Sequence, residues 1–134
     1  MNIQNKMKEL FGGSCYGYCI AWLFGENSTL KFLTSAFLEG WKEGFISDDG
    51  YVNNPLKYIR MISGIQYRDV QKPLIQDKSD IPTEPTIVEM ACPSGGSHFV
   101  VCHRQDKEVV LDFDPSGLSN SWKSQNFISY RVFC

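Results

Sequence analysis

The chain has 134 residues, of which 43% are hydrophobic and 21% are charged, and its formal net charge is -2. These values indicate one globular domain over residues 1–134 and argue against a nucleic-acid partner, because nucleic-acid-binding proteins need a basic surface. The start, MNIQNKMKEL, has no apolar stretch, and no run of residues reaches membrane-spanning length. We therefore expect no membrane partner and a cytoplasmic location, or export without a Sec signal; the oligomeric state stays open.

Helices are expected in the N-terminal half of the chain. Residues 15–24 are apolar on every side, which predicts a buried helix that Gly25 can end. Apolar residues at helical spacing predict a second helix over about 28–39. The clearest helix signal is the third, because Asn54 is a good N-cap, a proline follows it, and Gly64 can close the helix.

The C-terminal half changes to patterns that are typical of β-strands. Short links between the predicted strands favour a mainly antiparallel sheet, and helices followed by strands define an α+β fold. The predicted strands are residues 65–70, 86–91, 97–104, 108–113 and 127–133.

The cysteines point to chemistry rather than to cross-linking. Their number is odd and their spacing is irregular, so we expect neither a disulfide framework nor a structural zinc site. We also expect no cofactor. They are Cys15, Cys19, Cys92, Cys102 and Cys134. Cys15 would open the first helix, where the helix N-terminus favours a thiolate, whereas Cys19 would lie one turn inside an apolar helix, which disfavours the charged form. Cys15 is therefore the candidate nucleophile.

A nucleophilic thiol needs a base, and the base needs a group that orients it. The chain has two histidines, His98 and His103, five residues apart on one predicted strand and hence on opposite faces. A three-residue hairpin loop over 105–107 would place His98 opposite Asp114, with Asp112 one diagonal step away. A two-residue loop would move both aspartates to the other face.

The loop chemistry bears on this choice of register. Three-residue hairpin loops usually carry glycine at a left-handed position, and the segment QDK has none. Asp106 is the residue there that tolerates a positive φ, so we expect it in that conformation.

Two patches of the sequence carry a resemblance to a known family. One is GGSCYGYCIAWLFG, in which a glycine-preceded cysteine opens a buried helix; the other is GSHFVVCHRQDKEVVLDFDPSG. Together they resemble the papain-like cysteine peptidases, most closely the small bacterial branch that includes the double-glycine leader peptidases. The resemblance implies a papain-like fold and a thiol hydrolase of a peptide or amide substrate. Cys15 would be the nucleophile, His98 its proton partner and Asp114 the orienting group of a catalytic triad.

The sequence departs from the family at the oxyanion donor. The family has a glutamine six residues before the cysteine, whereas this chain has Glu9, which cannot donate when ionised. Gln4 or Asn5 could supply that donor instead. Asn120 lies in an Asn-Ser-Trp sequence similar to that of papain, and it competes with Asp114 and Asp112 as the orienting group.

Two other functions stay open at this level. The chain could be a papain-like binding module without catalysis, which the glutamate at position 9 suggests. It could also be a regulatory protein that binds a metal through Cys15, Cys19 and His98, and metal analysis of the purified protein would distinguish this case.

Overall fold

The computed structural model describes residues 15–26, 29–91, 97–115 and 126–134. Within these ranges the α-helices come first and the strands follow, so that the predicted α+β class and the antiparallel pairing are confirmed. The helices are α2 (Cys15–Phe24), α3 (Leu30–Lys42), α4 (Pro55–Ser63) and the short 3₁₀ helix η1 (Lys78–Asp80). The strands are β1 (Val70–Gln71), β2 (Thr86–Ala91), β3 (Ser97–Gln105), β4 (Glu108–Phe113), β5 (Asn126–Tyr130) and β6 (Val132–Phe133).

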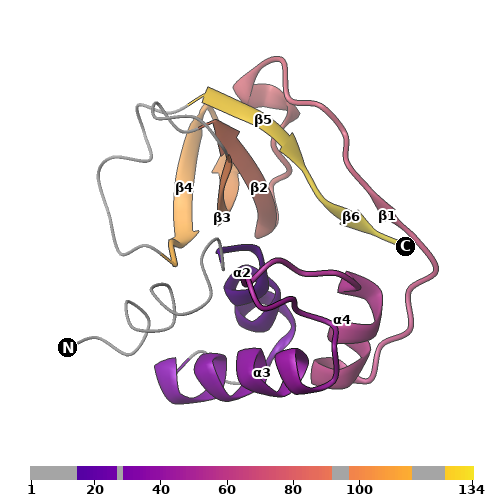
Figure 1. The fold of residues 1–134 in the computed structure, drawn as a ribbon. Helices are drawn as coiled ribbons and strands as arrows, with labels where there is room; N and C mark the ends of the chain where they lie inside the picture. The colour runs from indigo at the N-terminus through magenta and orange to yellow at the C-terminus, as the bar shows by residue number, and fades with distance from the viewer. Residues whose placement is uncertain (1–14, 27–28, 92–96, 116–125) are drawn as a thin grey trace.

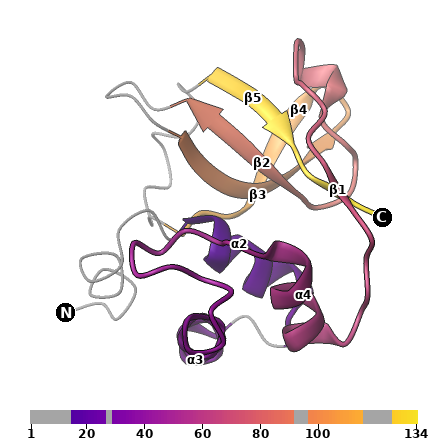
Figure 2. The same ribbon diagram turned by 45° about the vertical axis from the view of Figure 1, so that its right-hand side comes forward.

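The strands form two antiparallel sheets. The larger has four strands in the order β4-β3-β2-β5, and the smaller pairs β1 with β6. In Figures 1 and 2 the large sheet and the helices form two layers, and α2 lies between the sheet and α3. In the described part of the chain, no helix is long and apolar enough to cross a membrane.

The central turns of α2 form the middle of the core. Tyr18, Ile20 and Ala21 have no exposed surface, and they cluster with Phe37 of α3 and with buried residues of β2 and β3. The ring of Phe37 stacks on that of Tyr18, with centroids 5.0 Å apart. The last turn of α2 is only half-buried, so the prediction of a helix buried on every side holds for its centre and not for its end.

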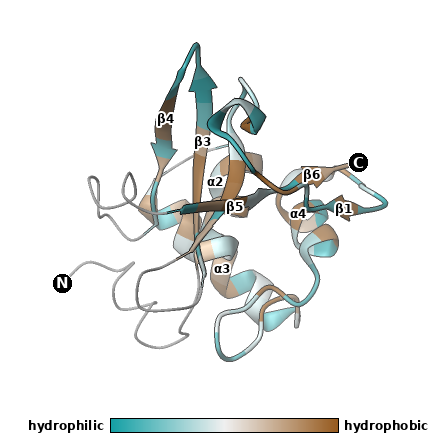
Figure 3. Cartoon of the chain, turned by 90° about the horizontal axis from the view of Figure 1, so that it is seen from above, coloured by the Kyte–Doolittle hydropathy of each residue, from teal (hydrophilic) through white to brown (hydrophobic). Residues whose placement is uncertain are grey.

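A second apolar cluster lies on the other face of the large sheet. Val88 and Met90 of β2 and Val100 and Cys102 of β3 are fully buried there, together with Ile81, which follows η1. Figure 3 shows apolar residues along β2 and β3, and polar residues at the tip of the β3–β4 hairpin. The sheet is therefore covered on both faces where it approaches α2, while the hairpin tip projects into solvent.

Most of the predicted elements are found, with corrected ends. The helix predicted over 28–39 is capped at Thr29 and runs to Lys42. The predicted strand over 65–70 is reduced to Val70–Gln71, and the one over 127–133 breaks at Arg131 into β5 and β6. The third helix has its expected termini, since Asn54 caps it and Gly64 closes it with φ 78°.

The β3–β4 hairpin differs from the predicted three-residue loop. Gln105 pairs with Glu108, which leaves a two-residue turn of Asp106 and Lys107. Asp106 has φ 57°, as expected from its tolerance of the left-handed region. The register predicted for the hairpin is therefore wrong, and the way in which Asp114 still reaches His98 is described below.

Phe37 provides a test of the core. We expect Phe37→Ala to lower the free energy of unfolding by about 3–5 kcal/mol, because the ring is fully buried and its removal leaves a cavity beside Tyr18. Denaturant unfolding measures the change. The matched control is Leu74→Ala, since Leu74 is 69% exposed and its loss should change stability by less than about 0.5 kcal/mol. Equal effects of the two substitutions would contradict this core.

Candidate active site

Cys15 is the first residue of α2. Its side chain meets His98 of β3, with Sγ 3.3 Å from Nδ1. Both residues are 8% exposed, so the contact is largely shielded from water but not sealed. The first N–H groups of a helix have no partner within the helix, and they carry the positive end of its dipole. The start of α2 is therefore a position where a negative sulfur is stabilised.

His98 has a carboxylate on its other ring nitrogen. Its Nε2 is 2.9 Å from Oδ1 of Asp114, in a pair that is almost buried. Cys15, His98 and Asp114 thus form one continuous chain of polar contacts, in which the histidine is held from both sides. The structure brings together the three residues that the sequence analysis selected.

A β-bulge accounts for the position of Asp114. From the hairpin turn the pairing runs regularly to Cys102 and Leu111, and it then shifts so that Val101 pairs with Phe113. The bulge leaves Asp112 without a partner across the strand and moves the chain beyond it by one residue. Asp114 consequently lies diagonally across from His98 and on its face of the sheet, and not directly opposite as the predicted loop required.

Asp112 contacts the second histidine, His103, instead. Its Oδ2 is 2.7 Å from Nδ1 of His103, in a pair that is partly exposed. Each histidine therefore has its own aspartate, and Asp112 is excluded as the direct partner of His98. The other candidates for orienting or oxyanion-donating roles, Gln4, Asn5 and Asn120, lie outside the described residues.

The surroundings of His98 favour its charged form. Burial alone would lower its pKa, but the hydrogen bonds to Asp114 and Cys15, together with their negative charges, outweigh burial and raise the pKa to about 9. At neutral pH the ring is therefore an imidazolium, which donates from Nδ1 toward the Cys15 sulfur and from Nε2 to Asp114. This is the arrangement that stabilises a thiolate.

The other buried cysteines have no such support. Burial, with the nearby charge of Cys15 next in importance, raises the pKa of Cys19 well above its ordinary value. Burial, followed by the charge of Asp112, raises the pKa of Cys102 to about 12. Both therefore remain neutral thiols, which agrees with the sequence-based choice of Cys15 over Cys19.

These differences predict a pattern of thiol labelling. In the folded protein, we expect iodoacetamide to leave Cys19 and Cys102 unmodified, because both are fully buried and protonated. Peptide mapping by mass spectrometry reads each cysteine separately, and labelling in denaturant provides the reference for full reaction. Modification of Cys19 at the rate of Cys15 in the folded protein would show that the first turn of α2 is incorrectly placed.

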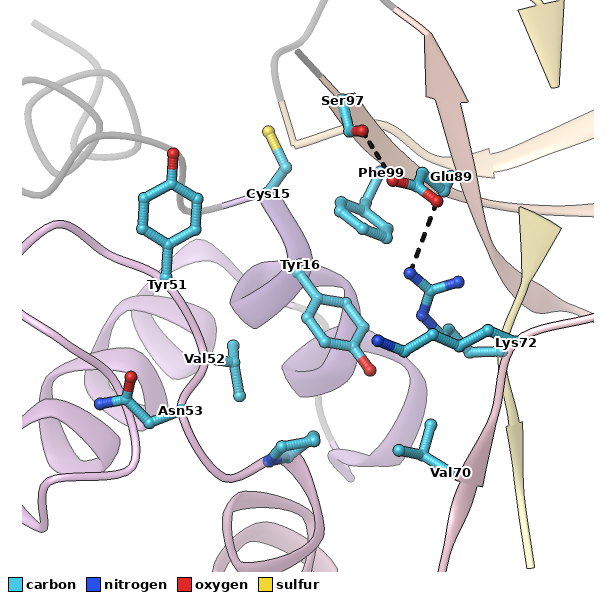
Figure 4. A pocket seen from close by; sticks show the side chains of 12 residues that line it. Cys15, Tyr16, Tyr51, Val52, Asn53, Val70, Lys72, Glu89, Ser97 and Phe99 are labelled. Atoms are coloured by element: carbon cyan, nitrogen blue, oxygen red, sulfur yellow. Dashed lines mark hydrogen bonds and ion pairs between the residues drawn. The ribbon is translucent and has the colours of Figure 1, made fainter. Parts of the chain in front are cut away.

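A pocket opens beside Cys15, with a volume of about 600 Å³ (Figure 4). One wall carries a polar network that the sequence analysis missed. Glu89 accepts hydrogen bonds from Ser97 (2.6 Å) and Ser129 (2.9 Å), and its Oε1 is 3.6 Å from Nη2 of Arg131. A glutamate within the apolar strand TIVEMA and an arginine within FISYRVF were the available signals.

The residues described do not offer a metal site of the kind considered above. Among them, no group of three or more histidine, cysteine, aspartate or glutamate side chains is arranged to hold a metal ion. Cys15 and His98 contact each other directly. Cys19 lies one helical turn further along α2 and is fully buried.

Comparisons of the chain with models of protein families, with curated proteins and with solved structures find no match. The geometry of the site is therefore the basis on which a function can be assigned.

Proposed function

We propose that this protein is a papain-like cysteine hydrolase that cleaves a peptide or amide bond. The observation that carries the proposal is the chain of contacts from the Cys15 sulfur through His98 to Asp114. A thiol at a helix N-terminus, an imidazole in contact with it and a carboxylate behind the imidazole have the geometry of a nucleophile, a base and an orienting group. The cysteine helix packed against an antiparallel sheet that carries the histidine supports the papain-like assignment.

The proposed reaction has two halves. The Cys15 thiolate attacks the carbonyl carbon of the substrate, and the tetrahedral oxyanion receives a hydrogen bond from the backbone N–H of Cys15. The intermediate collapses as the carbon–nitrogen bond breaks, and His98 gives its Nδ1 proton to the leaving nitrogen. Water then attacks the thioester while neutral His98 takes a proton from it. The acid leaves, and the thiolate and imidazolium are restored.

Asp114 acts on His98 rather than on the substrate. Its bond to Nε2 fixes the ring so that Nδ1 faces the sulfur, and its charge stabilises the imidazolium. The pocket beside Cys15 supplies the place for the substrate, because its volume of about 600 Å³ lies within the range of about 300–1,000 Å³ that is usual for ligand sites.

A peptide library tests the proposal. The full chain is incubated with the library at pH 7, cleavage is read by mass spectrometry, and a peptide carrying an electrophilic ketone is used to trap the nucleophile. We expect cleavage by the unmodified chain and a covalent adduct on Cys15. Cys15→Ala should fold normally and cleave nothing, whereas Cys134→Ser should remain active, because Cys134 is exposed and distant in sequence from the site.

The alternative functions give different results in this experiment or in metal analysis of the purified protein. A binding module without catalysis would retain peptides without cleaving them, and Cys15→Ala would retain them equally well. A metal-binding protein would contain stoichiometric zinc after purification and would lose it on Cys15→Ala. Either result would contradict the hydrolase proposal.

A further inference from the structure

The pocket beside Cys15 combines aromatic walls with a charged end. Tyr16 follows Cys15 in α2, and its ring lies 4.8 Å from that of Phe99, measured between centroids. The lining residues are Cys15, Tyr16, Tyr51, Val52, Asn53, Pro55, Val70, Lys72, Glu89, Ser97, Phe99 and Arg131.

Two of the three charged residues in the pocket neutralise each other. Glu89 is held by Ser97, Ser129 and Arg131, and although burial opposes its ionisation, these hydrogen bonds and the arginine charge keep its pKa below the usual value. Nη1 of Arg131 donates to Ser129 over 2.8 Å. The guanidinium also lies over the ring of Phe99, at 5.2 Å from its centroid. Glu89 and Arg131 are therefore fixed in the pocket wall, and their opposite charges compensate each other.

Lys72 is the third charged residue of the lining, and no described residue compensates its charge. It makes no hydrogen bond or ion pair with any other residue of the described ranges. Figure 4 shows its side chain extending from the strand side of the pocket toward the ring of Tyr16. Glu89 and Arg131 cancel, and the Cys15 sulfur is paired with the His98 ring, so Lys72 leaves the described lining with one positive charge in excess.

We propose that this pocket binds an acidic residue of the substrate, with its carboxylate at Lys72 and its carbon chain against Tyr16. The hydrolase would then prefer peptide or amide substrates that carry a carboxylate beside the scissile bond. This inference rests on the proposed function, since it takes the bond to be cleaved as the one presented to Cys15. A neutral or basic residue would leave the Lys72 charge unpaired or would be repelled by it.

The test uses three aryl reagents that differ only in charge. They are 4-(iodoacetamido)benzoate, the neutral 4-(iodoacetamido)benzamide and the cationic 4-(iodoacetamido)benzylamine. The rate of Cys15 alkylation is followed by peptide mapping at low ionic strength, and the alkylation of Cys134 in the same sample corrects for intrinsic reactivity. Because Lys72 is exposed, we expect a moderate preference, with the benzoate reacting about two- to fivefold faster than the benzamide.

Variants of Lys72 show whether this residue causes the preference for the benzoate reagent. Lys72→Gln should abolish the preference, and Lys72→Glu should invert it in favour of the benzylamine. The matched control is Lys31→Gln, which removes an exposed lysine of α3 that is not part of the pocket and should leave the preference unchanged. Equal rates with the three reagents, or a preference that survives Lys72→Gln, would overturn the inference.

The outcomes separate this inference from the proposed function. If Cys15 reacts rapidly with all three reagents and without preference, the acidic subsite is wrong and the hydrolase proposal stands. If Cys15 reacts with none of them, both are overturned.

Discussion

Replacing His98 with Gln lowers the rate at which iodoacetamide alkylates Cys15 by about 10²-fold at pH 7, the lower end of what a positioned acid–base partner contributes. The unmodified protein presents an imidazolium at 3.3 Å from the sulfur, and its positive charge stabilises the reactive thiolate. Glutamine can donate a hydrogen bond but carries no charge. Mass-spectrometric mapping of the Cys15 peptide over time measures the rate in both proteins.

The ratio of the alkylation rates of the unmodified protein and His98→Gln should depend on pH. The pKa of His98 is raised to about 9, so that the imidazolium is present below this pH and is lost above it. The ratio of the two rates should therefore be large between pH 6 and 8 and should decrease as the pH rises through about 9. A ratio that is small at pH 7, or that grows above pH 9, would mean that no ion pair exists between these residues. His103→Gln is the matched control and should leave the rate unchanged.

Replacing Asp114 with Ala lowers the turnover of a cleaved library peptide by about 10³–10⁴-fold, as expected for loss of the orienting carboxylate of a triad. The carboxylate accepts the Nε2 proton of His98 at 2.9 Å, and the pair is almost buried. Without it the ring loses both its orientation and the charge that stabilises the imidazolium. Steady-state kinetics with the same peptide measure the effect, which we expect in kcat rather than in KM.

Asp112→Ala is the control for Asp114. Asp112 lies two residues away in the same strand region but contacts His103, so its loss should change turnover by less than tenfold. If Asp112→Ala is the more damaging substitution, the bulge in β4 is misplaced and the assignment of the two aspartates must be exchanged.

The local patterns of the sequence predict much of this structure. Strands 86–91 and 108–113 are found with their predicted ends, and the cysteine helix begins at Cys15 and ends at Phe24. These elements are set by short-range rules, since alternation of side chains and the position of glycine act within a few residues. The same rules are enough to select Cys15, because the residues next to a helix start in the sequence make that start recognisable.

The register of the site could not be predicted in this way. A loop of two residues, taken alone, places Asp114 on the wrong face, and it is the bulge at Asp112 that corrects the error. Bulges depend on how two strands fit each other and leave little trace in either strand alone. The pairing of Glu89 with Arg131 was not predicted for a related reason. Glu89 lies in β2 and Arg131 lies between β5 and β6, and these segments meet only in the folded protein.

The most direct test of the account compares two cysteines in one sample. Cys134 is exposed, whereas Cys15 is 8% exposed, so access to reagent alone would make Cys134 the faster to react. The central claim is that His98 and the start of α2 activate Cys15 as the nucleophile. The measurement is the ratio of iodoacetamide alkylation rates of Cys15 and Cys134 in the folded full chain at pH 6.5. We expect Cys15 to react faster. A faster reaction at Cys134 would contradict it.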